Sequence, residues 1–140
     1  MGAPPVGDLY LDEPWVSIRW VGVHHYVHSE WKGFATSSEF RDALMRALDA
    51  IRDKRSVAYL SDTRKVKVVV HADQAWVNEV WIPLVVASGV KRVALVTAAS
   101  GLGKMNVEDT IHLVDNRGLL MRGFNSLADA RQWLAEIRPV

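Results

Sequence analysis

The sequence predicts a single α/β domain built on a mixed β-sheet, with an N-terminal antiparallel hairpin and then alternating strands and helices. Two patterns predict it. Apolar and polar residues alternate with period 2 early in the chain, as in half-buried strands. Helical apolar stripes then alternate with short apolar runs, and right-handed crossovers make such strands mainly parallel. A length of 140 residues suits one domain, here with about four helices.

The first three predicted strands cover residues 9–12, 16–20 and 23–31. The turn between the last two is placed at Gly22. On the third strand, one face would carry Val23, His25, Val27, Ser29 and Trp31, and the other His24, Tyr26, His28 and Glu30.

Thr36 and Glu39 form a capping-box pattern, which predicts a helix beginning there. Its apolar stripe runs from Phe40 to Ile51, and its other face is charged. Residues 57–60 then form a short apolar run suited to a buried strand.

The second half of the chain continues the alternation. Residues 65–70 are compatible with an extended segment, and Asp73 is predicted to cap the next helix. Pro83 inside that helix predicts a kink, and Gly89 predicts its end. The remaining predicted elements are a strand at 90–97, a helix at 105–116, a strand at 119–124, and a helix from Ser126 to 137.

Composition excludes several classes of protein. The chain has no cysteine, so disulfides, zinc–thiolate sites and thiol catalysis are ruled out. The net charge is +1 and no basic stripe indicates nucleic-acid binding. No apolar run reaches the length of a membrane span, and no signal peptide is recognisable, so we expect a cytoplasmic protein.

The chemical motifs are weak. The loop 98-AASGLGK-104 lacks the first glycine of a Walker loop and the hydroxyl residue after its lysine, so a flexible loop is favoured, although it could bind an anion. His24 and His28 would lie about 13 Å apart on one strand face, too far to share a metal ion. No nucleophile elbow is present. We therefore expect no enzyme activity, no metal and no cofactor.

Trp76 and Trp81 lie five residues apart on one predicted helix. Core packing is the favoured role for both. The competing interpretation is that they line an apolar pocket between this helix and the sheet.

Four segments together resemble a known family: 31-WKGF-34, 60-LSDTR-64, 76-WVNEVWIPLVVASGVKRVALV-96 and 124-FNSLADARQWL-134. The chain is similar to small bacterial proteins described as SpoIIAA-like or STAS-like, which are grouped by fold with CRAL-TRIO lipid-binding domains. The resemblance extends from Leu9 to Leu134. It implies one STAS-like domain over residues 8–138, preceded by a flexible tail at 1–7.

The resemblance also implies a function. Anti-sigma-factor antagonists of this fold act by protein–protein contact, and phosphorylation of a Ser or Thr after an Asp at a strand end switches them. The matching residue here is Thr63, which follows Asp62 and has Ser61 beside it. This chain continues with Arg64 and Lys65 where those regulators have a small hydroxyl residue and a glycine. An alternative role for Asp62 is to pair with Arg64 and fix the turn.

Two functions follow as expectations. The first is a non-enzymatic regulatory or protein-interaction domain that uses Ser61, Asp62, Thr63, Arg64 and the loop that contains Lys104. The second is a carrier or sensor of a small apolar or amphipathic ligand, bound beside Trp76 and Trp81. A homodimer through the exposed face of the N-terminal hairpin is a further expectation.

Overall fold

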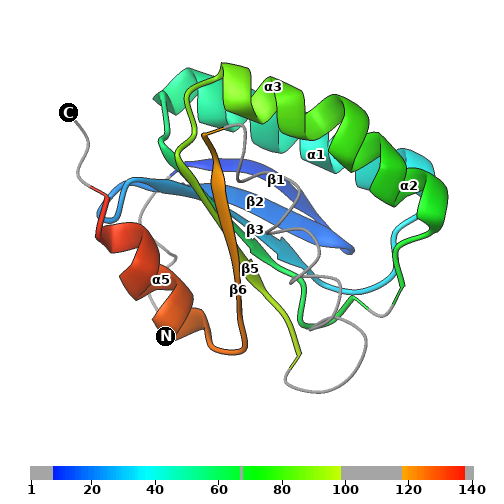
Figure 1. Cartoon of the computed structure of the whole chain (residues 1–140). Coiled ribbons are helices and arrows are strands. Elements are labelled where there is room, and N and C mark those ends of the chain that lie inside the picture. The colour runs from blue at the N-terminus through cyan, green and yellow to red at the C-terminus, as the bar shows by residue number, and fades with distance from the viewer. Residues whose placement is uncertain (1–7, 67, 99–117, 138–140) are drawn as a thin grey trace.

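A six-stranded sheet forms the centre of the protein, with its strands in the order β1-β2-β3-β4-β5-β6 (Figure 1). The computed structural model describes residues 8–66, 68–98 and 118–137. The strands are β1 (Leu9–Glu13), β2 (Val16–Val21), β3 (Tyr26–Trp31), β4 (Ala58–Asp62), β5 (Arg92–Val96) and β6 (Leu120–Phe124). The sheet is mixed as predicted, because β1, β2 and β3 pair antiparallel and β3 to β6 pair parallel.

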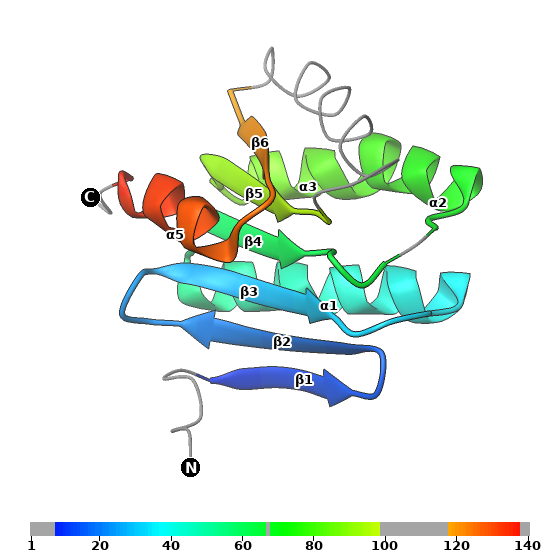
Figure 2. The ribbon, with the colours of Figure 1, turned by 90° about the horizontal axis from the view of Figure 1, so that it is seen from below.

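Helices cover the two faces of this sheet unequally. The helical segments are α1 (Ser37–Lys54), α2 (His71–Trp76), η1 (Val77–Trp81), α3 (Ile82–Ala87) and α5 (Leu127–Ala135). The first four lie on one face, and α5 lies on the other (Figure 1). From the α5 side, β1, β2 and much of β3 are in view with no described helix in front of them (Figure 2). The described helices therefore leave these strands uncovered on this face.

The predicted capping box begins α1. The Thr36 hydroxyl accepts a hydrogen bond from the Glu39 backbone N–H at 3.2 Å, and the Glu39 carboxylate accepts one from the Thr36 N–H at 2.9 Å. The helix ends at Arg55, which has a left-handed backbone with φ of 50°. The capping prediction is confirmed.

Segments α2, η1 and α3 follow one another directly, and η1 between them has π-helical hydrogen bonding. The Ile82 N–H donates to the Val77 carbonyl, one residue further back than in an α-helix. Pro83 comes just after this π turn, in the first turn of α3. A proline has no N–H to donate, and the π turn lies where the regular α-helical bonding would be interrupted. The proline is thus tolerated by a change of helix type.

Asp73 does not cap this helix, so that prediction was wrong. The helix begins earlier, with Val70 at the N-cap position and no side-chain cap. The buried Asp73 carboxylate instead accepts hydrogen bonds from Ser37 Oγ at 2.8 Å and Arg41 Nε at 2.9 Å. It links the start of α2 to the start of α1.

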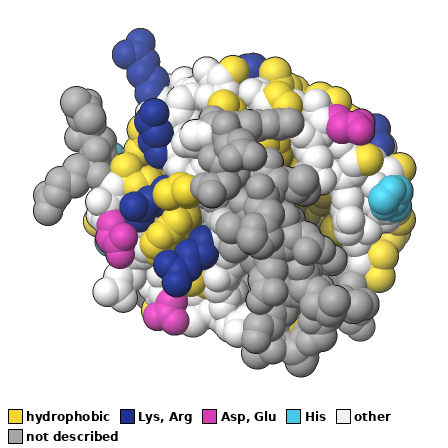
Figure 3. All heavy atoms as spheres, in the orientation of Figure 1, with side chains coloured by type: hydrophobic (Ala, Val, Ile, Leu, Met, Phe, Trp, Pro, Cys, Tyr) yellow, Lys and Arg dark blue, Asp and Glu magenta, His cyan; other side chains and the backbone are white. Residues whose placement is uncertain are grey.

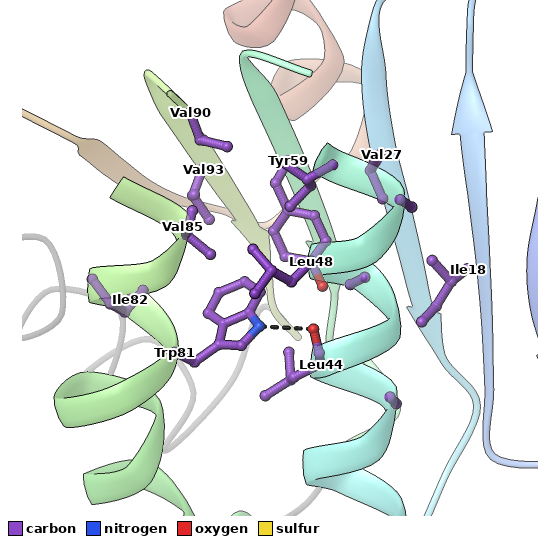
Figure 4. Packing of buried hydrophobic residues seen from close by; sticks show 14 of the residues in the cluster. Ile18, Val27, Leu44, Leu48, Tyr59, Trp81, Ile82, Val85, Val90 and Val93 are labelled. Carbon is purple, nitrogen blue, oxygen red and sulfur yellow. Dashed lines mark hydrogen bonds between the residues drawn. The ribbon is translucent and has the colours of Figure 1, made fainter. Parts of the chain in front are cut away.

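The core has two parts, one on each side of the sheet. The larger lies between the sheet and the helices α1 and α2–η1–α3, and includes Ile18, Val27, Leu48 and Val85 (Figure 4). The smaller part of the core lies between the sheet and α5, and includes Leu60. On β3 and β4, successive side chains therefore alternate between the two parts.

Other differences from the sequence prediction are local. Strand β3 begins at Tyr26 rather than at residue 23, because His25 takes a left-handed backbone with φ of 59° in the preceding turn. Residues 68–70 form no strand. The predicted tail at 1–7 and the predicted fourth helix at 105–116 lie outside the described residues. Within the described part of the chain, no helix has the length and hydropathy needed to cross a bilayer.

Candidate functional site

Strand β4 is buried along its whole length and carries Ser61 and Asp62 at its end. Ser61 points into the larger core, where its hydroxyl accepts a hydrogen bond from Trp31 Nε1 at 3.1 Å. On the same face, the Tyr59 hydroxyl donates to Ser29 Oγ at 2.7 Å. Ser61 is 5% exposed, so it does not form part of the accessible surface in this structure.

Asp62 and Arg64 form the ion pair that the sequence predicts. Arg64 Nε and an Nη donate to the two carboxylate oxygens at 2.9 and 2.7 Å, and the Arg64 backbone N–H donates to the carboxylate at 3.2 Å. Burial acts to raise the pKa of the Asp62 carboxyl, but the hydrogen bonds and charge of Arg64 outweigh it and leave the pKa below its usual value. The carboxylate therefore stays ionised and fixes the turn.

Thr63 is held between these two residues by the neighbouring strand. Its backbone N–H and its hydroxyl both donate to the Val96 carbonyl, at 2.7 and 2.8 Å. The side chain is half-buried. We call Ser61, Asp62, Thr63, Arg64 and Lys65 the β4 corner, because these residues connect the end of the strand to the following turn.

The two tryptophans do not line a shared pocket. Trp81 is 2% exposed, its indole N–H donates to the Leu44 carbonyl at 2.7 Å, and its ring contacts Tyr59 edge-on at 5.4 Å (Figure 4). Trp76 is partly exposed, and the Arg41 guanidinium lies 5.4 Å from its ring centre. Trp81 is therefore a core residue, which agrees with the favoured interpretation of the sequence, and its burial speaks against the competing role at a ligand surface. Lys104 lies outside the described residues.

A groove on the α5 side of the sheet was not predicted from the sequence. It has a volume of about 440 Å³ and is lined from β2, β3, the turn between them, the β4 corner and α5. We call it the sheet groove. Its charged side chains are Arg19, Glu30, Asp62, Arg64 and Arg131. Lys and Arg side chains lie beside hydrophobic ones on the side of the molecule where α5 lies (Figure 3).

His28 lies on the floor of the sheet groove, directly across from Arg19 in the β2–β3 register. Burial lowers the pKa of its imidazole to about 4. The Asp62 carboxylate acts to raise this pKa, and the guanidinium groups of Arg131, Arg19 and Arg64 act to lower it. The imidazole is consequently neutral at pH 7.

His28 and its neighbours do not form a metal site of the usual kind. His24 and His28 flank Tyr26 on one face, with ring centres 6.3 and 6.1 Å from the tyrosine ring. Over the described ranges, no group of three or more potential ligands could hold a metal ion.

Comparison with known proteins identifies the family of this chain. The SpoIIAA-like family model matches residues 26–135, from β3 to the end of α5. The chain belongs to the SpoIIAA-like family.

A solved structure agrees with this assignment. It is an uncharacterised protein of the DUF3478 family, with a SpoIIAA-like fold, from Shewanella loihica PV-4. The two superpose with a TM-score of 0.58 over 96% of this chain and 99% of that chain, at 15% identity, which supports the shared fold alone. No curated protein matches the sequence.

In this SpoIIAA-like chain, the signal for the sheet groove was partly visible in the sequence. Tyr26, His28 and Glu30 alternate on one strand face, which is unusually polar for a central strand. Arg131 comes from α5, 105 residues from Tyr26, and its Nε donates to the Tyr26 hydroxyl at 3.2 Å. Only the tertiary structure could bring them together.

Proposed function

We propose that this SpoIIAA-like protein is a non-enzymatic regulatory domain that binds a partner protein through the β4 corner. Its family fold supports the proposal, because the related anti-sigma-factor antagonists work by protein–protein contact. The resemblance to those proteins implies that Thr63, in the centre of the corner, corresponds to their switch residue.

The observation that carries the proposal is the fixed conformation of this corner. Asp62 is buried, with a side chain only 6% exposed, whereas the Arg64 side chain is 44% exposed. Three hydrogen bonds hold Arg64 to Asp62, and two hold Thr63 to Val96. A cation that is already ordered loses little conformational entropy when a partner binds.

The hydroxyl groups of the corner favour binding over catalysis. Ser61 Oγ is buried against Trp31, and the Thr63 hydroxyl donates to a backbone carbonyl. An activated nucleophile instead needs a general base within hydrogen-bond reach. Among the described residues, neither hydroxyl is hydrogen-bonded to a histidine or a carboxylate.

Phosphorylation of Thr63 would act on the same contacts. It would remove the hydroxyl hydrogen bond to Val96 and place about two negative charges beside Arg64. The phosphate would compete with Asp62 for the guanidinium. Partner binding would then change with the orientation of Arg64.

Affinity capture from the native host tests this role. The baits are the wild type, Arg64→Gln, Thr63→Glu, Thr63→Val and a control, Arg52→Gln, on the exposed face of α1. We expect the wild type and the control to capture a partner that Arg64→Gln does not capture. We also expect Thr63→Glu and Thr63→Val to capture different sets of partners. Retention by a folded Arg64→Gln variant would exclude the corner as the contact, and identical sets for the two Thr63 variants would exclude the phosphoswitch.

A further inference from the structure

The sheet groove gathers three guanidinium groups from separate elements. Arg19 comes from β2, Arg64 follows β4 and Arg131 comes from α5. Arg19 lies across from His28 in the β2–β3 register. Arg131 donates to the Tyr26 hydroxyl, and the Tyr26 ring centre lies 6.1 Å from that of His28, so both arginines adjoin one region of the groove. The side chains of Glu30 and Asp62 supply two carboxylates, which leaves one positive charge uncompensated.

Two of these arginines are not neutralised by direct contact. Arg64 is bound to Asp62 through both carboxylate oxygens. Within residues 8–66, 68–98 and 118–137, Arg19 and Arg131 take part in no salt bridge. Guanidinium groups bind carboxylates and phosphates through paired N–H donors, so an anion would find two such groups here.

Two polar groups near these arginines have hydrogen-bonding capacity that the described residues do not use. Tyr26, which is 1% exposed, accepts a hydrogen bond from Arg131, and the described residues provide no acceptor for its own O–H proton. His28 Nε2 is buried, and the described residues provide no hydrogen-bond partner for it. Buried polar atoms nearly always have a partner, and exceptions require an explanation.

The rest of the groove suits an apolar, planar group. Val21, Val23 and Leu127 contribute aliphatic side chains, and Val23 is 65% exposed. The rings of His24 and Tyr26 are stacked with an interplanar angle of 19°. Aromatic ligands favour such stacked or offset surfaces.

We propose that the sheet groove binds a small aromatic monocarboxylate, with the carboxylate between Arg19 and Arg131 and the ring against Val21, Val23 and the exposed His24. One negative charge matches the one uncompensated positive charge. The groove volume of about 440 Å³ lies within the range of small-molecule sites, toward its lower end. The groove shares Asp62 and Arg64 with the β4 corner. The carboxylate contacts proposed here are those of Arg19 and Arg131, which are not part of that corner, so either proposal can fail without the other.

NMR titration of the wild-type protein with benzoate and phenylpropionate tests the proposal, with benzylamine as the cationic control and inorganic phosphate as the anion without a ring. We expect saturable shifts of the Arg19 and Arg131 Nε–H resonances and of the β3 amides, with either carboxylate. Benzylamine should leave them unchanged. Arg19→Gln and Arg131→Gln should each raise the Kd about 10-fold or more, and Arg52→Gln should not change it.

Three results would overturn the proposal. The first is the absence of saturable shifts in the groove with either carboxylate, and the second is equal binding of benzylamine. The third is inorganic phosphate binding more tightly than benzoate, which would show that the ring does not contribute to binding.

N-acetylphenylalanine, which imitates a peptide carboxyl terminus, identifies the source of the carboxylate. Tighter binding of this compound than of phenylpropionate would assign the groove to a peptide and reject a free metabolite. If Arg19→Gln does not fold, Arg19→Lys keeps the charge without the paired donors and should still weaken benzoate binding.

Discussion

As the pH falls, protonation of His28 in the unfolded chain should destabilise the protein before the Asp and Glu side chains are protonated. The His28 pKa is about 4 in the folded protein, against an ordinary value of 6.5 that applies to the unfolded chain. Between these values the unfolded chain binds a proton that the folded protein excludes. Stability is therefore complete above about pH 6.5 and decreases as the pH falls toward 4.

The size of the effect follows from that difference in pKa. At about 1.4 kcal/mol per pKa unit, His28 contributes about 3 kcal/mol that is lost by pH 4. About 1.4 kcal/mol should already be lost at about pH 5.5, where Asp and Glu are still largely ionised. The groups facing the imidazole are the guanidinium groups of Arg19, Arg64 and Arg131 and the carboxylate of Asp62. Burial, the largest cause, opposes its protonation.

Urea unfolding followed by tryptophan fluorescence, from about pH 7.5 to about pH 5, measures this loss. His28→Gln removes the titrating group and should flatten the profile over that range. His24→Gln, which removes an exposed imidazole from the same groove, is the matched control and should keep the wild-type slope. An NMR titration of the His28 ring that gives a pKa near 6.5, or a His28→Gln profile as steep as that of the wild type, would refute the reasoning.

Three further substitutions test the packing and the helix ends by thermal or urea unfolding. Trp81→Phe removes the indole hydrogen bond to the Leu44 carbonyl and part of the buried ring, so we expect a loss of about 2 kcal/mol or more; a loss below about 0.5 kcal/mol would contradict a core role for the indole. Thr36→Ala removes the cap that accepts from Glu39 and should cost about 1 kcal/mol, with unchanged stability counting against the capping box. Gly89→Ala places a Cβ on a backbone with φ of +98°, so we expect a loss of at least about 1 kcal/mol; a neutral effect would show that the turn can relax.

Local patterns were sufficient to predict most of the elements. The two-residue alternation on β3 correctly separated Val27 from Tyr26 and His28, since side-chain direction on a strand depends only on position. The capping box at Thr36 was equally local, because both of its hydrogen bonds join residues three apart. Such features need no knowledge of the rest of the fold.

The features that the sequence did not predict depend on contacts between distant segments. The burial of Trp81 was the favoured expectation, but the acceptor of its indole N–H, the Leu44 carbonyl, was not predictable, because a backbone carbonyl is supplied by any residue. Asp73 has the residue type of a cap, but its partners belong to another helix. The sheet groove needs α5 to lie over the sheet beside β3, and Arg131 on α5 is 105 residues from Tyr26. The Asp62–Arg64 pair was predictable because its partners are two residues apart.

The strand order has a consequence for how the chain folds. Among the described strands, each pairs with the one before it in sequence, so none of them is inserted between two that have already formed. Sheet growth can proceed in one direction, from β1 toward β6, and each new strand joins an edge that is already present. The two antiparallel pairings, β1–β2 and β2–β3, are close in sequence and have a low entropic cost of loop closure, whereas the parallel pairings from β3 to β6 must each close a longer loop. During synthesis, β1, β2 and β3 can pair and receive α1 before β6 has left the ribosome, and the edge that β3 then presents stays exposed until β4 covers it.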